Sequence, residues 1–84
     1  MIIKKIYIGG TIDLFHYGHV NVFKNLKYYM NKESLELGAL SKVIVAVNSD
    51  SFAKSYKRKT VMNQYERLAV VNSCKYVDYA FIMD

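Results

Sequence analysis

The stretch VIVAV, residues 43–47, is an uninterrupted apolar run in the middle of an 84-residue chain. Its residues do not alternate between polar and apolar, as they would in a strand with one face in water. Such a run is typical of a strand that is covered on both faces, as in a parallel sheet. The stretch therefore predicts one strand of a parallel sheet.

A further strand is predicted at the start of the chain. IIKKIYI, residues 2–8, is rich in β-branched and aromatic residues and ends at Gly9 and Gly10, which predict a tight turn. From His19 onward, apolar residues recur at helical spacing and predict an amphipathic helix of about three turns. These residues are Phe23, Leu26 and Met30. The polar segment NKESLELGALSK, residues 31–42, is expected to extend the helix and then form a loop.

The second half of the chain predicts a loop, a helix and a strand. NSDSFAKSYKRKT, residues 48–60, is polar and basic and is interpreted as a loop. Asn63 and Glu66 have the spacing of a capping box ahead of an apolar stretch, so a helix is expected to begin near Asn63. YVDYAFI, residues 76–82, is interpreted as the third strand.

The order strand, helix, strand, helix, strand determines the expected fold class. Right-handed crossovers then give an α/β fold, in which helices pack on a parallel three-stranded sheet. This is the first half of a Rossmann-like doubly wound fold. We expect residues 1–84 to form one domain.

Composition restricts the class of protein. A hydrophobic fraction of 52% and a charged fraction of 23% are ordinary for a globular domain. No apolar run approaches the roughly 18 residues of a membrane span, so a cytoplasmic protein is expected. The single cysteine, Cys74, excludes an internal disulfide. The net charge of +5 suits phosphate-bearing partners but does not distinguish a nucleotide from a polymer.

The turn after the first strand, GGTIDLFHYGH, residues 9–19, concentrates glycine, aspartate and histidine in one bend. In open α/β sheets, ligands bind at the carboxyl ends of the strands, where this turn is expected to lie. Glycine allows a ligand to approach the backbone, and the start of the following helix favours an anion. His16 and His19 are three residues apart, so they share one side of that start. Their imidazoles predict a phosphate site.

Two other interpretations of this turn remain open. Each histidine could be a helix cap or a satisfied polar residue with no chemical role. Asp13, His16 and His19 could instead bind a metal, since they supply one carboxylate and two nitrogens. We rank the metal below the anion, because glycine and a helix start favour negative charge, and we predict no protein-bound metal.

At this point the motifs resemble a known family. GTIDLFHYGH, residues 10–19, is similar to the signature of the cytidylyltransferase branch of the HxGH nucleotidyltransferases, with Ile12 where phenylalanine is usual. VAVNSD, TVMNQYERLAVV and CKYVDYAFI resemble that branch's second strand, second helix and third strand. The resemblance implies a Rossmann-like three-layer sandwich of the HUP type. Family members continue beyond the third strand, so the resemblance covers only an N-terminal part.

The resemblance implies roles for the residues of the turn. His16 and His19 would contact the nucleotide phosphates and stabilise the transition state. Thr11 and the adjoining backbone would hold the triphosphate, while Asp13 would order the turn. The implied nucleotide-binding residues are Gly9, Gly10, Thr11, Ile12, Asp13, His16 and His19.

Two basic residues outside the turn are implied to bind substrate phosphate. Lys57 occupies the place of a family lysine that neutralises phosphate and is counted with His16 and His19 as catalytic. It could also be part of a solvated basic loop. Arg67 would engage the phosphorylated substrate or anchor the loop, and it could instead only pair with Glu66.

The implied reaction transfers CMP from CTP to a phosphorylated alcohol and releases pyrophosphate, with Mg²⁺ bound on the triphosphate. Glycerol 3-phosphate is the first expected acceptor, and the product would serve phospholipid or teichoic acid precursor synthesis. A homodimer is also implied. The alternatives are a non-catalytic nucleotide-binding module and an adenylyltransferase. A nucleic-acid-binding domain built on KSYKRK, residues 54–59, ranks last because no recognition motif accompanies the charge.

Overall fold

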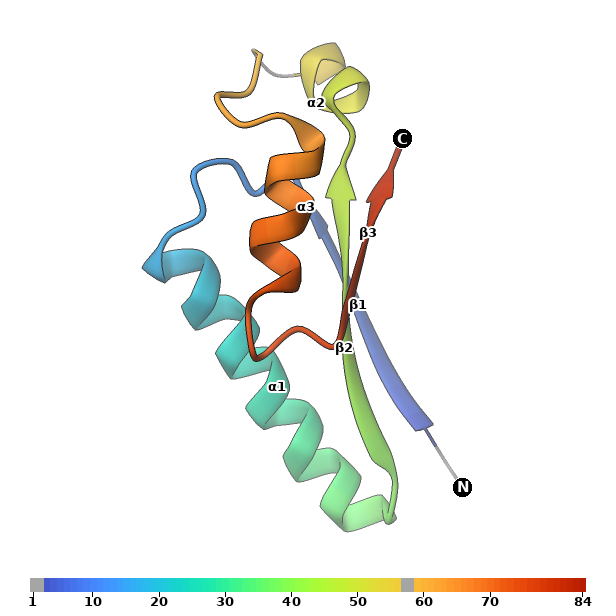
Figure 1. Cartoon of the computed structure of the whole chain (residues 1–84). Helices are drawn as coiled ribbons and strands as arrows, with labels where there is room; N and C mark the ends of the chain where they lie inside the picture. Colours follow the sequence, from blue (N-terminus) through green and yellow to red (C-terminus); the bar gives the residue numbers. More distant parts are fainter. Residues whose placement is uncertain (1–2, 57–58) are drawn as a thin grey trace.

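Helices connect successive strands in the computed structural model, which describes residues 3–56 and 59–84 (Figure 1). The elements are β1 (Ile3–Gly10), α1 (Tyr17–Leu37), β2 (Leu40–Asn48), α2 (Asp50–Tyr56), α3 (Gln64–Asn72) and β3 (Tyr79–Met83). This order confirms the predicted α/β class.

The three strands form one parallel sheet in the order β1-β2-β3. Ile8 of β1 pairs with Val45 of β2, which pairs in turn with Ala80 of β3. Val45 is fully buried and Ala80 is nearly so. The predicted parallel sheet is therefore confirmed, and the predicted apolar run lies in its central strand.

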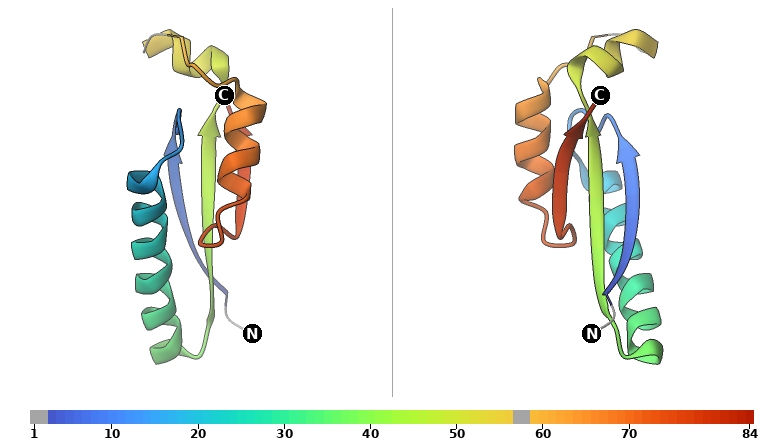
Figure 2. Two further views of the ribbon diagram at one scale, coloured as in Figure 1. Left: turned by 60° about the vertical axis from the view of Figure 1, so that its left-hand side comes forward. Right: turned by 90° about the vertical axis from the view of Figure 1, so that its right-hand side faces the viewer.

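Both long helices cover the same face of the sheet, as Figure 2 shows from two sides. Each crossover steps to the next strand in the same direction, so right-handed connections put α1 and α3 on one side. Val43, Val45 and Val47 belong to the hydrophobic core cluster under the helices and are fully buried. The described residues thus form two layers of the implied three-layer sandwich.

The prediction that β2 is buried on both faces is confirmed, although both long helices of the described chain pack on one face only (Figure 2). On the second face, Ile44 lies between Tyr7 and Tyr79 in the register of the three strands. Ile44 is only 8% exposed, while Tyr7 and Tyr79 are 63% and 59% exposed. The neighbouring strands therefore shield Ile44, and the outer tyrosines remain open to solvent.

The predicted extension of helix α1 beyond Met30 is confirmed. It has 21 residues and ends where Gly38 adopts a left-handed conformation and donates its N–H to the Ser34 carbonyl. The segment after Met30 contains lysine, glutamate and leucine, which favour helix, and has no proline to stop it. An ion pair of 2.7 Å between Lys4 and Glu33 joins this extension to β1.

The segment interpreted as a loop, residues 48–60, contains helix α2. Ser49 begins it, because its Oγ accepts a hydrogen bond of 3.1 Å from the Phe52 N–H. Ala53 on its inner side is fully buried. Among residues 50–55, whose burial the structure describes, Ala53 is the buried one. So short a helix leaves almost no periodic pattern in the sequence, which explains the wrong prediction.

The predicted start of α3 is confirmed. Asn63 accepts hydrogen bonds from the N–H groups of Tyr65 and Glu66, and the Glu66 carboxylate accepts from the Asn63 N–H. Strand β3 begins at Tyr79 rather than Tyr76, because Asp78 turns its carboxylate back to the Val43 N–H and Lys27.

Several of these connections lie together at one end of the sheet. The turn after β1, the end of β2 with α2, and the segment that leads into α3 all lie at the carboxyl edge (Figure 1). Across residues 3–56 and 59–84, no helix combines the length and apolar character needed to span a membrane.

Candidate functional site

The two histidines of the turn form the cap of helix α1. His16 is the N-cap residue, and its Nδ1 accepts a hydrogen bond of 2.9 Å from the Gly18 N–H. His19 lies one helical turn further, and its Nδ1 accepts a hydrogen bond of 3.1 Å from the His16 N–H. The centres of the two rings are 4.2 Å apart. The pair therefore satisfies two backbone donors that a helix start leaves free.

These hydrogen bonds determine where each ring holds its proton. A neutral imidazole has one N–H and one accepting nitrogen, so an Nδ1 that accepts leaves the proton on Nε2. Burial, and to a lesser extent the charge of His16, lowers the pKa of His19. His16 and His19 thus present two adjacent N–H donors in their neutral forms.

Gly18 is required by the position of the His16 ring. A Cβ added at Gly18 would lie 2.7 Å from Cε1 and 3.1 Å from Nδ1 of His16. Real Cβ atoms essentially never show the first of these distances, and the second is tighter than most of their contacts. The glycine between the histidines therefore leaves room for the ring that caps the helix.

Asp13 joins the turn to a distant part of the chain. Its Oδ1 accepts from the N–H groups of Leu14 and Met62, at 3.1 Å and 2.9 Å, and its Oδ2 accepts from Val61 at 2.8 Å. Although partial burial pushes its pKa upward, these three donors hold it below the usual value of a carboxyl group. The predicted ordering of the turn by Asp13 is present, and the longer link to residues 61–62 is additional.

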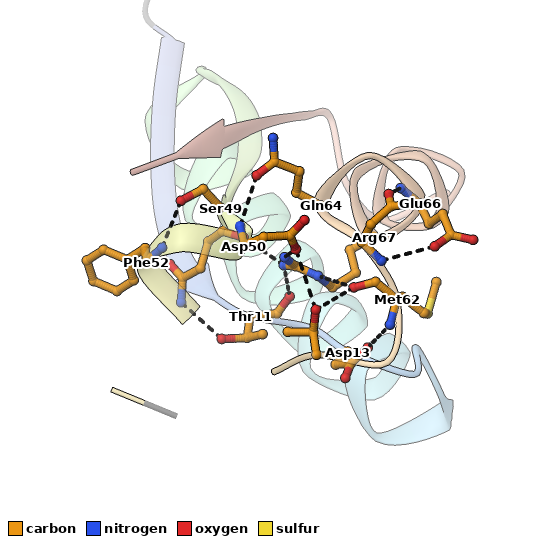
Figure 3. Close-up of polar contacts among 12 residues, drawn as sticks. Thr11, Asp13, Ser49, Asp50, Phe52, Met62, Gln64, Glu66 and Arg67 are labelled. Atoms are coloured by element: carbon orange, nitrogen blue, oxygen red, sulfur yellow. Dashed lines mark hydrogen bonds and ion pairs between the residues drawn. The ribbon is translucent and has the colours of Figure 1, made fainter. Parts of the chain in front are cut away.

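Arg67 is fully buried, and Figure 3 shows its guanidinium among polar groups of several segments. One of its terminal nitrogens, Nη1, donates to the carbonyls of Thr11 and Asn48, each at 2.7 Å. Nε donates to the Met62 carbonyl at 3.0 Å, and Nη2 forms an ion pair of 2.8 Å with Asp50. The same ion pair, acting mainly as a hydrogen bond, lowers the pKa of Asp50.

This burial favours the anchoring role among those implied for Arg67. The guanidinium is 0% exposed and its described partners all belong to the protein. Its geometry fits the anchoring of the loop and offers no surface to a substrate phosphate. Arg67 therefore joins the ends of β1 and β2 to the start of α3.

Two cavities adjoin at this edge. One of about 660 Å³ has eight lining residues: Thr11, Ile12, Asp13, Leu14, His19, Lys59, Thr60 and Val61. The other, of about 370 Å³, is lined by Asp50, Ser51, Lys54, Lys59, Thr60, Val61, Asn63 and Glu66. Residues 59–61 are common to both linings and form the wall between them.

The predicted nucleotide-binding residues lie together at this edge. Four of them, Thr11, Ile12, Asp13 and His19, line the larger cavity, and the exposed His16 ring adjoins His19. Gly9 and Gly10 end β1 and line a smaller, mostly apolar cavity of about 260 Å³ with His19. The third residue predicted as catalytic, Lys57, lies outside the described residues.

Sequence reasoning did not identify Lys59 as a residue of the site. Lys59 lines both cavities, two residues after the position that the family motif indicated. The signal was present as the basic run KSYKRK, but a charge run does not tell which lysine faces a cavity. Asn48 was also missed, and its amide donates to the Thr11 hydroxyl at 3.2 Å.

The metal interpretation of the turn fits the geometry poorly. Both oxygens of Asp13 accept backbone hydrogen bonds, and the Nδ1 atoms of both histidines do the same. Within the described ranges, no three His, Cys, Asp or Glu side chains are grouped so that they could hold a metal ion.

Comparison with known proteins shows the same fold and family. Residues 7–84 match the family model described as cytidylyltransferase-like. A lipopolysaccharide core biosynthesis protein from Thermoplasma volcanium superposes with a TM-score of 0.79 over 96% of this chain and 58% of its own. Its sequence is 23% identical, so this likeness concerns the fold.

Three curated relatives illustrate the sequence similarity. Choline-phosphate cytidylyltransferase A of Homo sapiens is 36% identical, and ethanolamine-phosphate cytidylyltransferase of Dictyostelium discoideum is 32% identical, each over 88% of this chain. FAD synthase of Methanothermus fervidus is 38% identical over 87% of this chain. The chain spans 18% of each cytidylyltransferase and 46% of the FAD synthase. Because the family model matches nearly the whole chain, from the middle of β1 to the last residue, the chain belongs to the cytidylyltransferase-like family.

Proposed function

We propose that this chain carries the phosphate-binding part of a nucleotidyltransferase that transfers CMP from CTP to a phosphorylated amino alcohol. In this reaction a phosphate oxygen of the acceptor attacks the α-phosphorus of CTP. The bond from that phosphorus to the oxygen that bridges to the β-phosphate breaks, and pyrophosphate leaves with the electron pair. The paired Nε2 donors of His16 and His19 carry the proposal.

The two histidines suit this reaction because their donors are preorganised. Negative charge grows on the phosphate oxygens as the transition state forms, and fixed N–H donors stabilise it without rearrangement. The helix cap holds each ring in place through Nδ1, so only Nε2 is left for a ligand. His19 lines a cavity whose volume of about 660 Å³ is in the range of small-molecule sites.

Two phosphate-bearing substrates repel each other, so the site also needs cations. Lys59 is placed to supply one, because it lies in the wall shared by both cavities. Lys57 remains a prediction from the family motif. The carboxylate of Asp13 is committed to backbone donors, so we propose that Mg²⁺ is held by the triphosphate rather than by this chain.

The names of the relatives guide the choice of substrates. Phosphoethanolamine and phosphocholine are the acceptors named for the two cytidylyltransferases, whereas glycerol 3-phosphate gains no support from the comparisons. FAD synthase favours an adenine nucleotide as the second candidate. A homodimer remains a prediction, as does the alternative of a module that binds nucleotide without turnover.

The test is pyrophosphate release from CTP or ATP with ethanolamine phosphate, choline phosphate or glycerol 3-phosphate as acceptor. We expect release with CTP and an amino-alcohol phosphate, and loss of release when His16 and His19 both become alanine. Release that persists in the double variant would exclude the proposed role of the histidines. Binding of CTP without release for any acceptor would favour the non-catalytic module.

A further inference from the structure

The turn that carries the histidines holds two residues in an unfavourable backbone conformation. Ile12 has a φ of 55° and Leu14 a φ of 50°, which makes them the two non-glycine residues with positive φ in the described chain. Left-handed backbone is costly for residues with a Cβ, and most of all for a β-branched residue such as Ile12. Residues persist in it only where the surroundings hold them there.

Asp13 lies between these two residues and supplies the holding contacts. Its carboxylate accepts the N–H of Leu14 on one side and the N–H groups of Val61 and Met62 on the other. Hydrogen bonds to an ionised carboxylate are stronger than those between neutral groups. The residue thus ties the turn to a segment that lies 48 residues further along the chain.

We name residues 59–63 the strap, because they end at the cap of α3 and residues 59–61 line both cavities. Arg67 holds the strap from below through the Met62 carbonyl, and the Thr60 hydroxyl bonds the same carbonyl at 2.7 Å. Asp13 holds it from the side of the histidine turn. The strap also carries Lys59, the cation of the cavity wall.

We propose that Asp13 is a positioning residue that sets the distance between the histidine pair and Lys59. Its carboxylate keeps the turn in a left-handed conformation that presents His16 and His19, and keeps the strap beside them. The inference rests on the proposed function, because it places the histidine pair and Lys59 on opposite sides of one bound phosphate. It goes beyond the ordering of the turn, since it links two groups from distant parts of the chain.

Asp13→Asn is the direct test, because it keeps the shape of the side chain. Asparagine retains one accepting oxygen but places an NH₂ group against an N–H donor of the strap. We expect the Val61 and Met62 amides to exchange with solvent at least about tenfold faster, and the affinity for inorganic pyrophosphate to fall about tenfold or more. The amide of Val45 in the central strand should keep its protection, which separates this effect from unfolding.

A rescue variant separates positioning from general stability. Glycine adopts positive φ without cost. Asp13→Asn combined with Leu14→Gly should therefore restore the conformation of the histidine turn without restoring the hydrogen bonds to the strap. We expect part of the pyrophosphate affinity and the imidazole chemical shifts of the wild type to return, while Val61 and Met62 continue to exchange quickly.

Asp78→Asn provides a matched control at the opposite end of the sheet. Asp78 also accepts a backbone N–H, that of Val43, and forms an ion pair with Lys27. We expect this change to lower the unfolding temperature and to leave pyrophosphate affinity unchanged.

Several results would overturn the proposal. These are unchanged exchange of Val61 and Met62 in Asp13→Asn, wild-type affinity despite fast exchange, or an equal loss of affinity in Asp78→Asn. A wild-type chain that binds neither pyrophosphate nor CTP would contradict the proposed function instead. The exchange rates and imidazole shifts would still show whether Asp13 holds the turn and the strap together.

Discussion

Helices α1 and α3 begin with the same pattern of reciprocal hydrogen bonds but use different side chains. In α3, Asn63 accepts from the helix start and Glu66 reaches back to the Asn63 N–H. In α1, His16 and His19 occupy the corresponding positions and make the corresponding bonds. One box consists of residues that favour helix starts in general, and the other of a residue type that does not.

The difference shows what each helix start contributes. The cap of α3 places the next residue, Arg67, under the turn and the strap, where its donors meet protein oxygens. The cap of α1 leaves the Nε2 side of both rings available beside a cavity. The start of α3 therefore assembles the site, and the start of α1 presents its donors.

Removing the anchor on α3 should have the largest effect. Arg67→Met leaves the carbonyls of Thr11, Asn48 and Met62 without their charged donor in a buried place. Asp50 is 46% exposed and can be solvated, so the cost comes from the three carbonyls. Each polar group left without its donor costs about 1–3 kcal/mol, so we expect the free energy of unfolding in urea to fall by about 3 kcal/mol or more. Lys27→Met is the control, because its ion pair with Asp78 is partly exposed and worth about 1 kcal/mol. Equal losses in the two variants would contradict the anchoring role.

Variants that separate the roles of Nδ1 and Nε2 of His16 should give the next largest effect. His16→Asn can keep an acceptor near the position of Nδ1 but loses the Nε2 donor. We expect it to preserve the cap while slowing pyrophosphate release about a hundredfold, as for other lost oxyanion donors. His16→Gln should instead disrupt the cap and lower the free energy of unfolding by about 1 kcal/mol, as Asn63→Ala should in α3. Full activity in His16→Asn would show that Nε2 is not used.

Gly18→Ala tests whether the histidine cap needs its glycine. Alanine favours the helix by about 1 kcal/mol, but its Cβ would collide with the His16 ring. We expect a nearly unchanged unfolding temperature together with a loss of pyrophosphate affinity of about tenfold, measured by calorimetric titration. Unchanged affinity would mean that the ring can bind phosphate from another position.

The smallest effect should come from the pH range in which histidine titrates, where the carboxylates of Asp13 and Asp50 stay ionised. Burial lowers the pKa of His19 below its unfolded value, so the unfolded chain binds more protons as the solution becomes acidic. This contribution to stability is complete above the unfolded pKa and is lost as the pH falls through the histidine range. We expect the unfolding temperature to fall on acidification and His19→Asn to weaken that fall. An identical pH profile in the variant would contradict the assignment.

Local patterns predicted the parts of the site that neighbouring residues build. The Asn63–Glu66 box and the pairing of His16 with His19 each span three residues, so the helical path alone brings the partners together. The apolar run of β2 similarly identified a buried strand of a parallel sheet. Helix α2 escaped prediction because its stability depends on the burial of Ala53, a tertiary contact.

The sequence by itself determined the order of the elements other than α2, the cap of α3 and the presence of two imidazoles at the start of α1, because these depend on periodicity and short spacings. Only the tertiary structure decided that Arg67 is an anchor, that Asp13 reaches the strap and that Lys59 lies in the cavity wall. These contacts join residues that are tens of positions apart. Their geometry exists only after the parallel sheet has brought its carboxyl edge together, and no local pattern carries that information.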